Sequence, residues 1–276
     1  MSHKREVFFL PSKNGDLFAI YYYPAGTSAE RGDILYVHPF ADEMNKSRRM
    51  AALQAGSFAK AGFGVLQIDL FGCGDSQGDF GQATWGIWKD NINTAVNWLI
   101  KKNKKKIVLW GLRLGALLMM DFVKDSLIPI ENYILWQPVL NGKMAIHQFF
   151  RLVAASQMMG KGGESIKQIR EKLNQGKNSE IGGYELNPDL VNEIEKINMA
   201  DLCPCTNSRI IWKEISLNDS GDIPPVSSRL IENFRNRGCR IEVDSITGDA
   251  FWNTIEISTL PDLITSTTRS ILCDKI

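Results

Sequence analysis

A strand pattern that passes directly into a helix pattern constrains the fold of this chain more than any other feature. Residues 107–110 are apolar without interruption, Gly111-Leu112-Arg113-Leu114-Gly115 follows, and residues 116–124 have helical spacing. An uninterrupted apolar strand is typical of a sheet covered by helices on both faces. The two flanking glycines permit a sharp turn between strand and helix, and such a turn presents its central side chain, here Arg113, at the edge of the sheet.

The same alternation of strands and helices continues through most of the chain. An antiparallel hairpin is expected first, with strands at 7–10 and 17–23 around Asn14-Gly15. Further strands are expected at 34–37, 64–70, 133–136, 209–215 and 239–245, and further helices at 46–61, 84–101, 226–236 and 260–272. The sequence therefore predicts an α/β fold with an eight-stranded, mostly parallel sheet flanked by helices.

Residues 141–205 break this alternation. The segment is rich in helix-forming residues, contains glycine clusters at 160–163 and 182–183, and has no buried strand pattern. We interpret it as a helical cap inserted into a core made of residues 1–140 and 206–276. A chain of 276 residues is long enough to bury a core of that size as one domain with an insertion.

Composition narrows the classes of partner. The formal net charge is +1, which gives no electrostatic reason to expect nucleic acid. The N-terminal residues lack the apolar core of a signal peptide, and the longest apolar stretch, 107–123, is too short to span a bilayer comfortably. We therefore expect a cytoplasmic protein without a membrane span.

The five cysteines are scattered and odd in number, so we expect free thiols. We expect neither a metal nor a cofactor.

The order of strands, the insertion after Gln137-Pro138 and the turn at Arg113 resemble the α/β-hydrolases. Four stretches are similar to one bacterial subgroup, the second of two hydrolase families associated with the exosortase A system: HPFADEMNKSRRM (38–50), DLFGCGDSQGDF (69–80), WGLRLGAL (110–117) and FWNTIE (251–256). The resemblance implies an α/β-hydrolase fold and an association with exopolysaccharide and protein-sorting loci.

The residues that hydrolysis would require are largely missing. An acyl hydrolase of this fold uses Ser, then Asp or Glu, then His, in that order along the chain. The serine position is Arg113, a permanent cation that cannot act as a nucleophile. No histidine follows His147, so an acid at Asp219 or Asp222 has no histidine to orient. The usual serine-hydrolase mechanism is therefore not available.

Three uses of the Arg113 position follow from its chemistry. Arg113 could bind a carboxylate or phosphate bidentately at a helix N-terminus, together with the backbone of Leu114 and Phe40. Alternatively, Glu43 or Asp42, expected in the loop after the 34–37 strand, could neutralise it internally, because a partly buried charge needs a partner. We expect Glu43 to be that partner, and a ligand could displace it.

The third use is a nonstandard hydrolysis in which Glu43 activates water and Arg113 stabilises the oxyanion. His38 or His147 could then serve as the base, although packing in the core or cap is the commoner role for such histidines. Together with Asn45 and Trp252, the candidate ligand-binding residues are His38, Phe40, Leu114 and His147.

Two classes of function are therefore carried forward. One is a catalytically degenerate protein whose pocket holds an anionic small molecule or partner. The other is a hydrolase of a small ester or acyl group in an exopolysaccharide or sorting pathway. A homodimer is left open.

Overall fold

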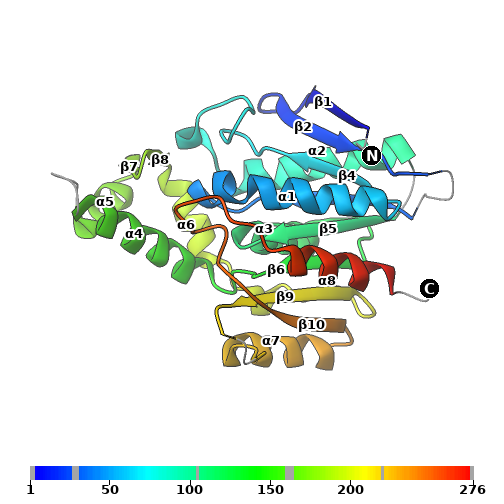
Figure 1. Ribbon diagram of the computed structural model, residues 1–276. Helices are drawn as coiled ribbons and strands as arrows, with labels where there is room; N and C mark the ends of the chain where they lie inside the picture. Colours follow the sequence, from blue (N-terminus) through cyan, green and yellow to red (C-terminus); the bar gives the residue numbers. More distant parts are fainter. Residues whose placement is uncertain (1–3, 27–30, 104–105, 159–164, 219–220, 274–276) are drawn as a thin grey trace.

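An eight-stranded sheet forms the centre of the molecule in the computed structural model, which describes residues 4–26, 31–103, 106–158, 165–218 and 221–273 (Figure 1). Its order is β1-β2-β4-β3-β5-β6-β9-β10. β1 and β2 are antiparallel to each other and β2 is antiparallel to β4, whereas all other neighbouring pairs are parallel. The mostly parallel eight-stranded sheet predicted from the sequence is confirmed.

The strands of the sheet are β1 (Arg5–Leu10), β2 (Leu17–Tyr22), β3 (Asp33–Val37), β4 (Gly64–Ile68), β5 (Ile107–Leu112), β6 (Asn132–Trp136), β9 (Arg209–Ser216) and β10 (Arg240–Thr247). The helices that pack on it are α1 (Asp42–Lys60), α2 (Trp85–Asn103), α3 (Leu114–Asp125), α7 (Pro225–Asn236) and α8 (Pro261–Leu272), with a short 3-10 turn η1 (Phe80–Gln82) before α2.

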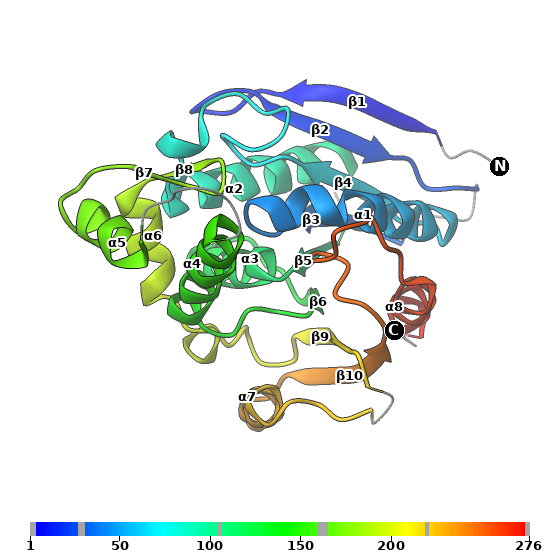
Figure 2. The same ribbon diagram turned by 60° about the vertical axis from the view of Figure 1, so that its left-hand side comes forward.

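Helices cover both faces of the sheet, as the apolar strand runs require. Figure 2 shows α1 and α8 on one face and α2, α3 and α7 on the other. The buried side chains accordingly form two clusters. In one cluster, side chains of α1 and α8 pack with strand residues such as Trp110 and Trp136. In the other, side chains of α2, α3 and α7 pack with strand residues such as Leu109, Tyr133 and Trp212. Residues 107–112 are all buried, so β5 lies in the middle of the core.

The segment between β6 and β9 stands at one end of the sheet. It contains α4 (Gly142–Met158), α5 (Ile166–Asn174), β7 (Ser179–Ile181), β8 (Tyr184–Leu186), α6 (Pro188–Lys196) and the 3-10 turn η2 (Met199–Asp201). The antiparallel hairpin β7–β8 was not expected there, because three-residue strands are too short to give a recognisable alternation. The segment is therefore helix-rich but not purely helical.

The two ends of this segment are joined to each other. The Gly142 amide donates to Ile197 O at 2.9 Å, the Met199 amide donates to Leu140 O at 2.9 Å, and Asn141 and Asn198 form an isolated antiparallel bridge. A Cβ atom on Gly142 would lie 1.8 Å from Ile194 O, so only glycine fits at this junction. The segment consequently leaves the sheet domain and returns to it at one place.

A charged side chain is enclosed where β9, β10 and α8 meet. Lys213 is completely buried, and its Nζ donates to Asp244, to Ser266 Oγ at 3.0 Å and to Ser270 Oγ at 2.7 Å. Burial alone would raise the pKa of Asp244, but hydrogen bonds from Lys213 and Ser266 and the charge of Lys213 together lower it. This cluster fastens α8 to the last two strands.

No helix among the described residues is both long and apolar enough to cross a membrane.

Candidate functional site

The site begins at a strained turn between β5 and α3. Arg113 has φ 54° and ψ −119°, a backbone conformation that is costly for any residue with a side chain. Two glycines make the turn sterically feasible. A Cβ on Gly111 would lie 2.6 Å from the backbone of Ala116, and one on Gly115 would lie 2.3 Å from Val37 O. The geometry is that of a nucleophile elbow, with arginine where α/β-hydrolases carry serine.

A second strained turn lies between β3 and α1. Ala41 has φ 50° and ψ −128°, and α1 begins at the next residue, four positions earlier than the sequence pattern suggested. We had expected Asp42 and Glu43 in a loop, but they belong to the first turn of α1. Acidic side chains suit this place because the positive end of the helix dipole stabilises them.

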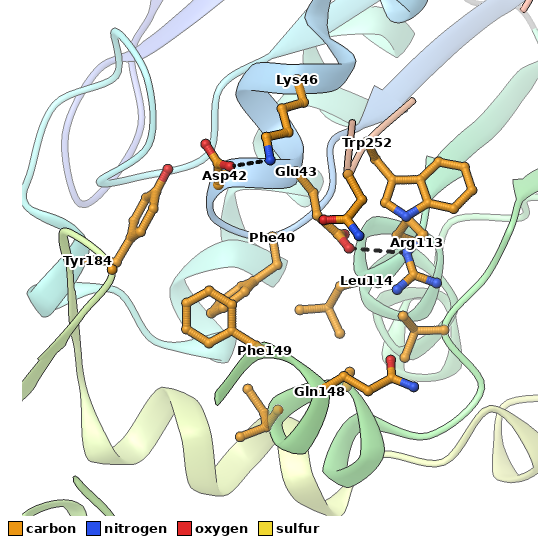
Figure 3. A pocket seen from close by; sticks show the side chains of 15 residues that line it. Phe40, Asp42, Glu43, Lys46, Arg113, Leu114, Gln148, Phe149, Tyr184 and Trp252 are labelled. Carbon is orange, nitrogen blue, oxygen red and sulfur yellow. Dashed lines mark hydrogen bonds and ion pairs between the residues drawn. The ribbon is translucent and has the colours of Figure 1, made fainter. Parts of the chain in front are cut away.

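Arg113 and Glu43 form an ion pair across the two turns. Arg113 Nε lies 3.3 Å from Glu43 Oε1, as expected from the sequence, and Figure 3 shows the two side chains meeting at one side of a cavity. Burial raises the pKa of Glu43, and the charge of Arg113 offsets only part of that effect. Asp42 pairs instead with Lys46 of its own helix, at 2.9 Å.

Trp252 packs over the guanidinium from the loop after β10. The Arg113 Cζ atom lies 5.3 Å from the centre of a Trp252 ring, a cation–π distance, and Trp252 is 7% exposed. This loop is where an α/β-hydrolase places its catalytic histidine. The Trp252 indole, in contact with the guanidinium, lies there instead.

The ion pair lies on the wall of a cavity of about 370 Å³. Seven of its fifteen lining residues come from the segment between β6 and β9 and eight from the rest of the chain, and most of its lining is apolar. The full lining is Phe40, Asp42, Glu43, Lys46, Arg113, Leu114, Val139, Ala145, Ile146, Gln148, Phe149, Gly182, Tyr184, Trp252 and Asn253. In Figure 3, Phe40 and Phe149 lie between the ion pair and Tyr184, so the cavity has a charged end and an aromatic middle.

Five of the residues proposed from the sequence line this cavity: Phe40, Glu43, Arg113, Leu114 and Trp252. Asn45 and His147 do not. Asn45 is exposed on α1 and donates to the Tyr184 hydroxyl at 3.4 Å, and His147 is exposed on α4 between the lining residues Ile146 and Gln148. Asp219 lies outside the described residues.

His38 is also absent from the lining, and both of its ring nitrogens are engaged. Nδ1 lies 2.7 Å from Pro39 O, and Nε2 accepts from the Leu70 amide at 3.1 Å. These partners fix a neutral ring with its proton on Nδ1, and burial lowers the pKa of His38. His38 connects β3 to the turn after β4 and cannot act as a base in this arrangement.

The cap residues of the lining were missed by sequence reasoning. Ala145, Ile146 and Phe149 recur at helical spacing on one face of α4. This spacing predicts that the face is buried, but it does not identify the cavity that the face lines. Tyr184 comes from the unexpected hairpin. Among the described residues no group of His, Cys, Asp and Glu side chains is arranged to hold a metal ion.

Comparisons with known proteins support the fold. Solved structures similar over nearly the whole chain include Est1E from Butyrivibrio proteoclasticus with ferulic acid bound (TM-score 0.67, 16% identity, 96% of this chain and 97% of that one). A thermostable carboxyl esterase from Bacillus coagulans in complex with glycerol is also similar (TM-score 0.67, 14% identity, 98% and 99%). These likenesses show the fold.

Sequence comparison gives the family. No curated protein matches the chain significantly. The family model described as serine aminopeptidase, S33, matches residues 28–191, which is more than half of the chain. The protein therefore belongs to this family of α/β-hydrolases.

Proposed function

We propose that the cavity binds a small amphipathic carboxylate, and that the protein is a binding member of its family without a serine-hydrolase reaction. The observation that carries the proposal is the state of the Arg113 guanidinium. Only Nε contacts Glu43, at the long distance of 3.3 Å. The two terminal nitrogens have no hydrogen-bond or ion-pair partner among the described residues, and neither is sealed from the cavity.

A carboxylate suits these free donors. The fork of a guanidinium matches two carboxylate oxygens, and such paired, charge-assisted hydrogen bonds are among the strongest in proteins. Leu114 begins α3, so its amide has no acceptor within the helix and its end of the dipole favours an anion. The head group of the ligand would therefore lie between Arg113 and the start of α3.

The remainder of the lining defines the rest of the ligand. Phe40, Phe149, Val139 and Ile146 present apolar surface, which favours an aromatic or short aliphatic body. Ferulic acid, the ligand of the similar Est1E structure, combines an aromatic ring with a carboxylate and is a suitable first probe.

Binding can be measured by quenching of tryptophan fluorescence, since Trp252 contacts Arg113. Ferulate should bind the wild-type protein, and methyl ferulate, which lacks the charge, should bind at least about tenfold more weakly. Glu43→Gln should bind ferulate about tenfold more tightly because Glu43 no longer competes for Arg113. The double variant Arg113→Gln/Glu43→Gln keeps a neutral pair of similar shape and should lose the preference for the acid.

Arg229→Gln is the matched control, because it removes an exposed arginine on α7 outside the cavity. Its ferulate affinity should equal that of the wild type. Equal binding of acid and ester by the wild-type protein would contradict the proposal.

A second candidate is slow hydrolysis with Glu43 as the base for water. The raised pKa of Glu43 and its place beside the elbow favour it. Turnover of short-chain nitrophenyl esters that is lost in both Glu43→Gln and Arg113→Ala would support this candidate and overturn the binding-only proposal. Residual catalysis without a triad is small, about 10³–10⁴ over water, so sensitive assays are needed.

We also propose the finer grouping with the exosortase A system-associated hydrolases. Support comes from four similar stretches, of which WGLRLGAL contains Arg113 and HPFADEMNKSRRM contains Glu43. Genes for exopolysaccharide synthesis or protein sorting are expected beside the gene for this protein. A neighbourhood without them would contradict the grouping.

A further inference from the structure

Two thiols touch each other near the starts of β9 and β10, and neither lines the cavity. Cys203 lies in the segment between η2 and β9, and Cys239 directly precedes β10. Their Sγ atoms are 3.6 Å apart, and both are free thiols. Cys239 is buried, whereas Cys203 is partly exposed. Solvent can therefore reach the Cys203 thiol, whereas the Cys239 thiol is enclosed by the protein.

The backbone fixes this contact from both sides. The Cys239 amide donates to Phe234 O at 3.0 Å at the end of α7, and the Arg240 amide donates to Ser208 O at 2.8 Å. The Asn207 amide donates to Gly238 O at 2.9 Å, and Gly238 has φ 92°, which suits glycine in such a turn. The turn before β10 and the segment before β9 are therefore hydrogen-bonded together around the thiols.

We propose that Cys203 and Cys239 form a reversible disulfide when the protein meets a low-molecular-weight disulfide. In the first step the Cys203 thiolate attacks one sulfur of the oxidant, a mixed disulfide forms, and one thiolate leaves and takes up a proton. In the second step the Cys239 thiolate attacks the Cys203 sulfur and the second thiolate leaves and is protonated. Two protein thiols are oxidised and one small disulfide is reduced to two thiols.

The environments of the two cysteines set the order of the steps. Cys203 is the more accessible, so it meets the oxidant first. Burial and, to a smaller extent, the neighbouring Cys203 together raise the pKa of Cys239 to about 12. Little Cys239 thiolate is present at neutral pH, so closure of the disulfide is the slow step and accelerates as the pH rises.

The bond would connect distant parts of the chain. The two residues are 36 positions apart, and between them lie β9 and α7. Cys203 also follows η2, whose Met199 closes the root of the cap segment. Oxidation would therefore fix the exit of the cap segment to the edge strand β10 and restrict the unfolded chain.

The experiment uses the full chain, fully reduced and then equilibrated with oxidised glutathione. Non-reducing peptide mapping should find residues 203 and 239 joined, with the mass lower by two hydrogen atoms. The unfolding temperature should rise by about 5–10 °C on oxidation and fall back on reduction. Cys203→Ala should abolish both changes, and Cys239→Ala provides a second test from the other partner.

Cys273→Ser is the matched control, since it removes an exposed cysteine elsewhere and should leave linkage and stabilisation unchanged. Three results would overturn the proposal: a Cys203–Cys205 bond, a stable glutathione adduct on Cys203 that never closes, or disulfides only between molecules. Ligand binding is not part of any readout, so the proposal stands or fails independently of the function proposed for the cavity.

Discussion

Arg113 is placed where several physical effects oppose one another. Its backbone is strained, and its cation lies at a helix N-terminus, the end whose dipole repels it. Glu43 and the Trp252 ring compensate, and both come from segments that line the same cavity. A side chain retained at such a position needs an anionic partner, and Glu43 supplies only one weak contact to it. The two guanidinium nitrogens without a partner among the described residues are the basis of the ligand-binding function proposed above.

The ion pair could be predicted from the sequence, but its surroundings could not. Glu43 was identifiable because a partly buried arginine needs a nearby acid. That Asp42 would turn to Lys46 depends on where α1 begins, and helix starts are poorly defined by sequence patterns. His38 ends a buried strand, for which a role in the core was the commoner expectation, but its two backbone partners become visible only in three dimensions.

Glu43 should make stability depend on pH in a distinctive direction. A carboxyl group whose pKa is raised by folding stabilises the native state below its unfolded pKa, and this contribution is lost as the pH rises through the folded value. The urea midpoint of the wild type, relative to that of Glu43→Gln, should therefore decrease as the pH rises above about 4.3, the ordinary pKa of a glutamate. A constant difference, or one that grows with pH, would show that the pKa of Glu43 is not raised.

At the scale of elements, the site depends on how closely α3 approaches β3. Gly115 makes this possible, since a Cβ there would lie 2.3 Å from Val37 O and 2.4 Å from His38 O. Both acceptors are backbone atoms, which cannot move aside alone. The sequence pattern Gly-Leu-Arg-Leu-Gly predicted this turn correctly because only a sharp connection explains glycines at both of its ends.

Gly115→Ala should therefore lower the free energy of unfolding by about 3 kcal/mol and weaken ferulate binding, because α3 must shift away from β3. Gly86→Ala is the control within α2. A Cβ on Gly86 meets only Thr84 Oγ1, at 3.9 Å, so the helix should gain about 0.5–1 kcal/mol. Urea unfolding measures both, and equal effects at the two glycines would contradict the close approach of α3.

An enclosed cation contributes to the attachment of α8, beside the buried apolar side chains of that helix. Lys213→Ala removes the charge and leaves a gap, and should lower the free energy of unfolding by about 4 kcal/mol. Lys213→Met should cost less, because its side chain still fills the space of the lysine stem and Asp244 remains partly exposed. If the methionine variant were the less stable of the two in urea, the charge would matter more than packing at this position.

For the molecule as a whole, the eight strands and their mostly parallel pairing could be predicted from the alternating apolar runs, whereas the order of the strands in the sheet is a finding of the structure. The internal structure of the cap segment could not be predicted in this way. Its strands are too short, and the pairing of its two ends leaves no periodic pattern in the sequence. The lining of the cavity comes from β3–α1, β5–α3, the loop after β10 and the cap, so no local stretch of sequence contains it. Its chemistry emerges only when the fold brings these segments together.

This dispersal means that one substitution at the elbow should not be enough to produce a serine hydrolase. Arg113→Ser restores a hydroxyl at the elbow, but no histidine follows His147 along the chain and His38 is engaged by backbone partners. The variant should remain unlabelled by fluorophosphonate probes under conditions where an active esterase is labelled. Labelling of Arg113→Ser would show that another group in the cavity can activate the serine.

The Arg113–Glu43 pair also implies that ligand binding moves protons. An anion that occupies Arg113 weakens the main interaction that favours the ionised form of Glu43 against its burial, so the pKa of Glu43 rises further on binding. In calorimetry the heat of ferulate binding should change with the ionisation enthalpy of the buffer, and affinity should weaken as the pH increases. Glu43→Gln should remove both effects. The cavity would then take up its ligand as the neutral acid, carboxylate and proton together, with the proton held on Glu43.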